Sequence, residues 1–173
     1  MEFTMNKSIQ ILFISIIYIA LSHSVYAACN TAIPESTPDS RFTINGDTVT
    51  DNLTGLIWMR CSVGKSWDGS TCTGTATLVN WKTALETAEN FVFAGADNWR
   101  LPNIKELTSI MEFSCSAPAL NENIFPGNTA SIYYSSSYQD PGSVRAVLLE
   151  TGEMHFAFVY FGNNNILLVR DPL

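Results

Sequence analysis

The chain has 173 residues, of which 46% are hydrophobic, 12% aromatic and 14% charged, and its formal net charge is −7. A charged fraction well below the roughly 25% usual in soluble domains, together with the aromatic content, predicts a packed globular domain and excludes a disordered chain or a coiled coil. Nine Lys and Arg against sixteen Asp and Glu lack the dense positive surface that a phosphate backbone requires, so no nucleic-acid partner is expected.

The N-terminal segment has the pattern of an export signal. Lys7 precedes an apolar run over residues 9–21, and a pattern that a signal peptidase reads ends at Ala27. We therefore predict a signal peptide over residues 1–27 and a mature protein that is periplasmic, secreted or at the cell surface, with no membrane span. Two alternatives remain open, which are an uncleaved anchor and a lipoprotein modified at Cys29.

All four cysteines follow the predicted cleavage site, and an oxidising compartment favours disulfides. Four cysteines predict two disulfides and allow three pairings. Cys61 and Cys72 flank a short Gly/Ser-rich segment, so we expect them to pair with each other, which leaves Cys29 to pair with Cys115. A four-Cys zinc site is the alternative, but the spacings contain no C-x-x-C pair, so no metal or cofactor is expected.

The mature chain begins with an extended lead-in over residues 28–40, followed by one domain over residues 41–173 without an internal linker. Short strands are expected early in this domain, because apolar segments are interrupted by turn dipeptides such as Asn45-Gly46. Their expected positions are residues 41–44, 48–49 and 56–59.

Two helices are expected in the middle of the chain. Asn80 is a suitable N-cap for an amphipathic segment that ends near Gly95. Asn103 and Glu106 have the spacing of a capping box at the start of a second helix. A long irregular loop over residues 116–132 then leads to strands separated by turns, at residues 133–137, 145–149, 154–161 and 166–170. This order predicts an α+β fold with two helices packed against a small, mostly antiparallel sheet.

Four segments match a known family in its own order. They are V-T-D-N-L-T-G-L-I-W at residues 49–58, W-R-L-P-N-I-K-E-L at 99–107, Y-S-S-S at 134–137 and V-R at 169–170. The chain resembles the Lcl C-terminal domain family, named for the end domain of a bacterial collagen-like adhesin. The resemblance implies a C-type-lectin-like α+β fold, braced here by disulfides, and a role at the cell exterior. In the namesake adhesin the domain is similar to a trimeric head that binds sulfated glycans.

The residues that carry these motifs are expected to be structural, with Trp in the core, Arg paired with a carboxylate or carbonyls, and Pro at the helix entry. They are Asp51, Thr54, Gly55, Trp58, Trp99, Arg100, Leu101, Pro102, Glu106, Leu107 and Arg170. The E-P-N and W-N-D triplets of C-type lectins do not occur in the sequence, so calcium binding has no motif to support it.

The residues expected to bind a ligand lie in loops or next to them. Trp67, in the segment between two cysteines, could stack on a sugar ring, and loop asparagines could bond to a glycan or coordinate Ca²⁺. Tyrosines beside serines give an adaptable recognition surface. The predicted ligand-binding residues are Trp67, Asn121, Asn123, Asn128, Tyr134, Tyr138, Asn163, Asn164 and Asn165.

The functional hypothesis is an exported, non-catalytic, adhesin-like recognition domain that binds a cell-surface carbohydrate or protein through its loops. A structural or accessory subunit of a bacterial surface appendage or envelope assembly is the alternative, with strands 133–137 and 154–161 as contact surfaces, and a homo-oligomer is compatible with both. A hydrolase ranks last. His155 is the one histidine after the predicted signal peptide, and it is expected to be half-buried in a sheet.

Overall fold

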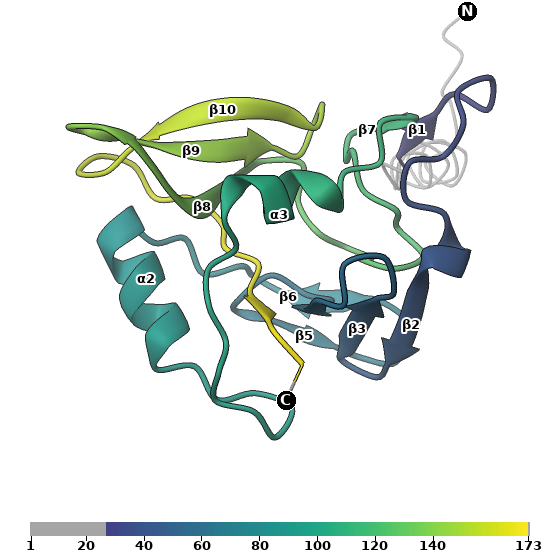
Figure 1. The fold of residues 1–173 in the computed structure, drawn as a ribbon, viewed down its shortest axis with the longest axis horizontal. Coiled ribbons are helices and arrows are strands. Elements are labelled where there is room, and N and C mark those ends of the chain that lie inside the picture. Colours follow the sequence, from purple (N-terminus) through teal and green to yellow (C-terminus); the bar gives the residue numbers. More distant parts are fainter. Residues whose placement is uncertain (1–26, 173) are drawn as a thin grey trace, which may run out of the picture.

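The computed structural model describes residues 27–172, so the predicted signal peptide lies outside the described residues except for Ala27 (Figure 1). Most of the regular structure is β. The strands are β1 (Ala28–Cys29), β2 (Phe42–Asn45), β3 (Thr48–Asp51), β4 (Ile57–Met59), β5 (Lys65–Trp67), β6 (Cys72–Gly74), β7 (Cys115–Ser116), β8 (Ile132–Asp140), β9 (Ser143–Leu148), β10 (Glu153–Phe158) and β11 (Val169–Arg170). The helices are a 3-10 turn at Asp39–Arg41, α2 (Trp81–Glu89) and α3 (Ile104–Ser109).

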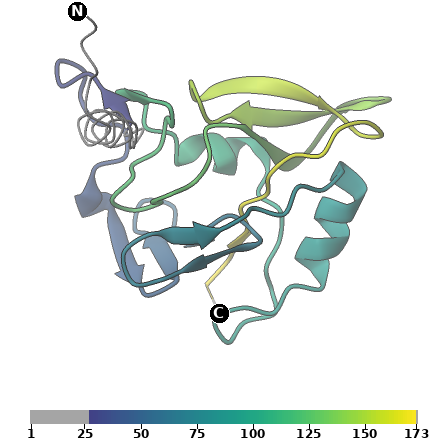
Figure 2. The same cartoon turned by 180° about the vertical axis from the view of Figure 1, so that it is seen from behind.

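These strands form four separate antiparallel sheets. The largest has the order β11-β4-β3-β2, and a second has the order β10-β9-β8. Two small pairs, β1 with β7 and β5 with β6, complete the arrangement. The three-stranded sheet lies along one side of the molecule and the four-stranded sheet lies along the other, with α3 between them and α2 beside them (Figures 1 and 2).

The expected α+β, C-type-lectin-like fold is therefore wrong as a description of the whole domain. The helices are only nine and six residues long, whereas strands and irregular segments make up most of the rest. The sequence pattern suggested one small sheet because each strand was identified by itself. Pairing between strands is non-local, and in this chain it distributes them over several sheets.

Local signals placed the starts of both helices correctly. The side chain of Asn80 accepts a hydrogen bond from the N–H of Thr83 at 2.9 Å and so caps α2. At α3, Asn103 accepts from the N–H of Glu106 at 3.0 Å, and the Glu106 carboxylate accepts from the N–H of Asn103 at 2.8 Å. The capping box is confirmed. Helix α2 ends at Glu89, earlier than expected, because Asn90 leaves the helical conformation.

The hairpin predicted at Asn45-Gly46 joins β2 to β3, with Asn45 opposite Thr48. Gly46 has a φ of +64°, which the turn requires and which glycine adopts without steric cost. Two strand pairs were missed. The segment between Cys61 and Cys72 contains most of the β5–β6 hairpin, and β1 pairs with β7 far along the chain.

The disulfides join Cys61 to Cys72 and Cys29 to Cys115, the pairing that the sequence favoured. The second disulfide fastens β1 directly to β7, where Cys29 lies opposite Cys115. The thiol of Cys29, which lipidation would modify, is bonded to Cys115 in this structure. The lead-in is also packed against the domain, because Thr37 is fully buried.

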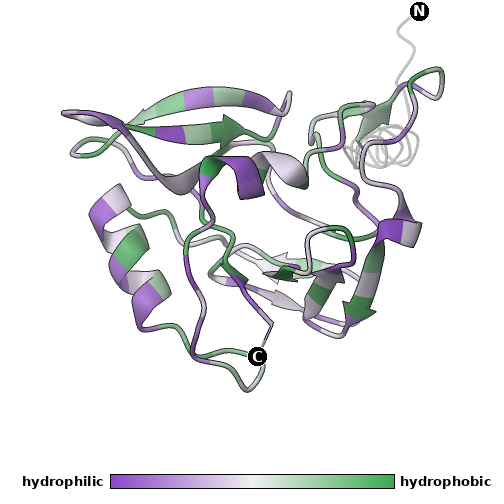
Figure 3. Cartoon of the chain, viewed as in Figure 1, coloured by the Kyte–Doolittle hydropathy of each residue, from purple (hydrophilic) through white to green (hydrophobic). Residues whose placement is uncertain are grey.

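The core lies between the two larger sheets, where hydrophobic segments of both converge (Figure 3). Its largest fully buried side chains include Trp58 from β4, Phe125 from the long loop, and Tyr133 and Tyr134 from β8. Consecutive strand residues point to opposite faces, so two buried tyrosines in a row show that β8 is covered on both faces here. The prediction that residues 133–137 form an exposed contact strand is therefore wrong for Tyr133 and Tyr134.

Candidate functional site

The residues of the sequence motifs form a structural framework of ion pairs and hydrogen bonds. The guanidinium of Arg100 donates to both oxygens of Glu106 at 2.7 and 2.8 Å and also contacts Asp171. Burial would raise the pKa of Glu106, but the bonds from Arg100 and Asn103 outweigh it and hold that pKa below its usual value. Glu106 therefore closes a helix cap and an ion pair at once, so its role is structural.

A Glu106→Gln variant should lower the free energy of unfolding by about 1–2 kcal/mol, because a neutral amide weakens a charge-assisted bidentate pair. Urea unfolding at pH 7 measures this. Glu89→Gln is a suitable control because Glu89 is an exposed carboxylate on neighbouring α2, and it should change stability by less than about 0.5 kcal/mol. An equal loss in both variants would contradict the role given to Glu106.

The remaining motif residues are also in the framework. The indole of Trp99 is buried and donates to the carbonyl of Phe93 at 3.0 Å, and the Arg170 guanidinium lies 5.5 Å from its ring centre. Asp51 is fully buried; burial would raise its pKa, but bonds from Arg41, Thr54 and the N–H of Leu53 lower it. These contacts explain the motif without a ligand.

Three of the predicted ligand-binding residues are buried. Tyr134 donates from its hydroxyl to the carbonyl of Gly162 at 3.2 Å, and burial raises its pKa. The Asn128 side chain accepts from the hydroxyl of Ser62 at 2.6 Å and donates to the carbonyl of Arg60 at 2.8 Å. Asn165 is 2% exposed. These side chains support loops from within and do not face solvent.

Trp67 has one ring face occupied by protein. The guanidinium of Arg60 lies 3.8 Å from the ring centre, and Trp67 is half-buried in β5. The same guanidinium donates to the carbonyls of Ile124 at 2.9 Å and Asn123 at 3.1 Å. Trp67 therefore covers a buried arginine, a contact that accounts for this side chain by itself.

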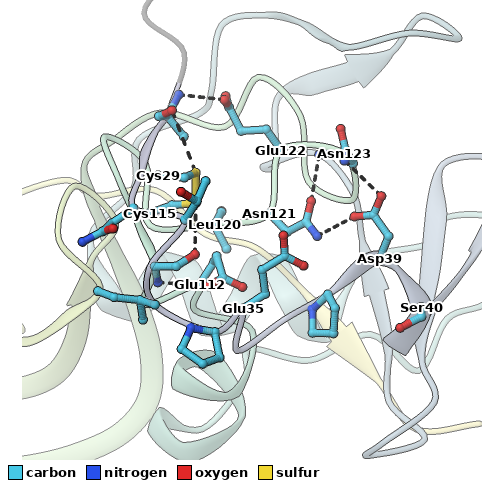
Figure 4. A pocket seen from close by; sticks show the side chains of 17 residues that line it. Cys29, Glu35, Asp39, Ser40, Glu112, Cys115, Leu120, Asn121, Glu122 and Asn123 are labelled. Atoms are coloured by element: carbon cyan, nitrogen blue, oxygen red, sulfur yellow. Dashed lines mark hydrogen bonds between the residues drawn. A yellow bond between two sulfur atoms is a disulfide. The ribbon is translucent and has the colours of Figure 1, made fainter.

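Asn121 and Asn123 line a cleft of about 790 Å³ between the lead-in and the long loop (Figure 4). Both side-chain amides donate to Asp39, at 2.7 and 3.0 Å, so they hold the lead-in in place. Glu122 accepts from the N–H of Ala27 at 2.9 Å. Four acidic residues are among those that line this cleft, but among residues 27–172 no group of three or more His, Cys, Asp or Glu is arranged to hold a metal ion.

Glu112 lies at the base of this cleft and is 3% exposed (Figure 4). Its carboxylate accepts from the N–H of Thr37 at 2.7 Å, the hydroxyl of Thr37 at 2.8 Å, and the N–H groups of Ser114 and Ser36 at 2.9 and 3.1 Å. Burial would raise the pKa of Glu112, but these bonds outweigh it and lower the pKa to about 2. The carboxylate ties the lead-in to the segment after α3.

The other predicted residues, Tyr138, Asn163 and Asn164, lie beside a second hollow but do not line it; we call it the aromatic hollow. It has a volume of about 390 Å³ and is lined by Asn80, Trp81, Lys82, Leu85, Val159 and Tyr160. Tyr138 packs against Trp81 with ring centres 6.5 Å apart. The backbone of Asn164 pairs with Val79 immediately before the start of α2, and Asn163 is exposed next to it.

The aromatic hollow combines apolar ring faces with polar groups at its rim. Tyr160 is 76% exposed and Tyr138 is 57% exposed, whereas the indole of Trp81 is oriented by a 2.9 Å bond to the carbonyl of Ser135. Lys82 and Asn80 supply polar atoms. Such a combination suits a ligand that offers an apolar face and hydroxyl groups.

Sequence reasoning found only the rim of this hollow. The sequence places Trp81 in an amphipathic helix and Tyr160 in a contact strand. Neither pattern indicates a hollow, because the hollow forms only when the segment after β10 returns to the start of α2. The sequence signal that could have indicated the hollow was the aromatic pair Tyr160-Phe161 directly before a Gly-Asn-Asn-Asn turn. His155 lies in β10 as expected, but it is exposed and not half-buried.

Comparison with known proteins gives one match. Residues 47–170 match the family model described as the Lcl C-terminal domain. A search of curated proteins and a search of solved structures return no match. No helix among residues 27–172 is long and apolar enough to cross a membrane.

Proposed function

Because the chain belongs to the Lcl C-terminal domain family, we propose that it is an exported, adhesin-like recognition domain that binds a cell-surface carbohydrate or protein without transforming it. Two disulfides fit an exported protein, because disulfides persist in oxidising compartments. The aromatic hollow is the single observation that carries the choice of binding site.

The proposed ligand is held by its apolar face. Tyr160 lines the hollow together with Trp81, and Tyr138 packs against Trp81, so two exposed rings lie near it, and the apolar face of a sugar ring stacks on such surfaces. The side-chain oxygen of Asn80 caps α2, which leaves its N–H groups and the exposed Lys82 ammonium to bond to hydroxyl groups of a ligand or to a partner's backbone. The distribution of polar groups around an apolar floor is typical of small-ligand sites.

We also propose that the domain is not an enzyme. All four cysteines are in disulfides, so none is a free nucleophile. Among residues 27–172, a Ser-His pair would have to use His155, which is exposed on the outer strand β10 of its sheet. A nucleophile and its base need to be oriented by surrounding groups, and this position does not provide that.

A glycan array probed with the oxidised mature protein, with and without chelator, tests the binding proposal. Tyr160→Ala should weaken binding about five- to tenfold, because it removes a stacking ring worth about 1 kcal/mol. Leu53→Ala is the matched control, since Leu53 is 75% exposed in a turn outside the hollow. Equal binding by both variants would exclude the aromatic hollow as the site.

A structural subunit of a surface assembly is the second candidate function. One observation favours it, which is that Met154, Phe156 and Phe158 of β10 are 60%, 58% and 66% exposed. If the protein binds neither a glycan on the array nor a cell-surface protein, this candidate is favoured over the first.

A further inference from the structure

Strand β10 is an open sheet edge. It is the outer strand of the sheet β10-β9-β8, and among residues 27–172 no strand pairs with its free side. Both views of the molecule show it along the rim (Figures 1 and 2). Natural edge strands are usually kept from pairing by Pro, Lys, bulges or short length. β10 has neither Pro nor Lys and pairs with β9 over six consecutive residues without a bulge.

The free backbone groups of this edge can be assigned. The N–H of Val159 donates to the carbonyl of Gly142 at 3.0 Å. In an antiparallel pair the bonded residues alternate, so Ala157 and His155 also bond towards β9. The N–H and C=O of Phe156 and Met154 therefore point outward, where an added strand would find them.

The same residues carry the exposed apolar side chains. Met154, Phe156 and Phe158 alternate along the strand and so share one face, and Arg145 of β9 lies 5.8 Å from the ring centre of Phe156 on that face. Ala157 is buried on the opposite face. An added strand would thus need its own apolar residues in alternate positions to match.

We propose that β10 pairs antiparallel with β10 of a second copy of this chain, about a two-fold axis at Phe156, so that two three-stranded sheets join into one. In this register Phe156 faces its own counterpart and Met154 faces Phe158 of the partner subunit. Apolar residues then oppose apolar residues on one face, and the outward groups of Phe156 bond reciprocally across the axis.

The charge on the strand permits this pairing although the chain carries a net charge of −7. Glu153 is the one acidic residue of β10 and lies at its first position. In the proposed register the two Glu153 carboxylates lie at opposite ends, about 20 Å apart, which exceeds the Debye length of about 8 Å at physiological salt. No acidic side chains of the two strands face each other.

The apolar area fits a small, reversible interface. Met154, Phe156 and Phe158 are 58–66% exposed, and large side chains of this kind have about 200 Å² each. They offer on the order of 370 Å² per copy, and strand pairing covers the flanks that face the partner subunit together with the backbone edge. An interface of this size belongs to the small end of specific interfaces, which are typical of weak association.

This inference rests on the second candidate function, the structural subunit. Its test is distinguishable from that of ligand recognition, because dimerisation is measured without any ligand. Sedimentation of the oxidised protein from about 1 to 100 µM should show a reversible monomer–dimer equilibrium. Phe156→Glu should weaken it at least tenfold, because it places two carboxylates opposite each other at the axis. Leu53→Glu, a charge added at a residue 75% exposed elsewhere, should leave it unchanged.

A cysteine variant tests the register. Phe156→Cys should give a covalent dimer under mild oxidation, since the two positions face each other across the axis, whereas Leu53→Cys should not. Circular dichroism checks that each variant is folded. A wild type that is monomeric or trimeric at every concentration, a Phe156→Glu variant that still dimerises, or equal crosslinking by both cysteine variants would overturn the proposal.

Discussion

Replacing Glu112 with Gln is expected to lower the free energy of unfolding at pH 7 by about 3 kcal/mol. The Glu112 carboxylate is buried and accepts bonds from Thr37, Ser36 and Ser114, which lower its pKa from the ordinary 4.5 to about 2. Each unit of pKa difference between the folded and unfolded states corresponds to about 1.4 kcal/mol. A neutral amide also brings N–H donors towards N–H donors, so some bonds are lost outright.

The pH dependence gives this prediction its signature. A lowered folded-state pKa stabilises fully above the unfolded value of 4.5, and the contribution disappears as the pH falls through about 2. The difference between wild type and Glu112→Gln should therefore be constant above pH 5 and shrink below it. Urea unfolding at several pH values measures the difference.

Glu35→Gln serves as the control, because Glu35 lines the same cleft but is exposed. It should change stability by less than about 0.5 kcal/mol at every pH. If the gap between wild type and Glu112→Gln stayed the same down to pH 3, the hydrogen-bonded carboxylate would not be the source of the stability.

The second large effect is expected at Arg60, which is 4% exposed. Arg60→Met should cost about 3 kcal/mol, because it leaves the carbonyls of Ile124 and Asn123 without their donor and removes the cation that stacks on Trp67. The methionine stem keeps most of the packing, so the loss reports on the charged head. Thermal and urea unfolding of the oxidised protein measure it.

Arg145→Met is the matched control, because Arg145 also lies over an aromatic ring but on an open sheet face. A solvated pair of this kind contributes less than about 1 kcal/mol. Similar losses at both positions would contradict the view that burial gives Arg60 its importance.

Features set by neighbouring residues could be predicted from the sequence. Both helix starts were found because Asn80, Asn103 and Glu106 act within one turn of their own backbone. The first hairpin was found for the same reason, since Asn45-Gly46 determines its turn. The Cys61–Cys72 disulfide follows from a separation of only 11 residues.

Features that depend on distant pairing could not be predicted. Tyr134 and Asn128 have the composition of a recognition surface, but their burial depends on which segments pack over them. The β1–β7 pair joins residues 86 positions apart, and no local pattern marks it. The aromatic hollow likewise depends on Val79 meeting Asn164. Composition identified aromatic and amide residues, but only the fold separates those that face solvent from those that hold loops.

The Cys29–Cys115 disulfide has a consequence under mechanical load. A pull applied before Cys29 passes through the sulfur atoms directly into β7, so the chain between the two cysteines carries no tension. That loop spans 86 residues and would otherwise lengthen by up to about 290 Å on stretching. Under a stretching force the oxidised protein should therefore extend far less than the reduced protein, and single-molecule stretching in both states measures that difference.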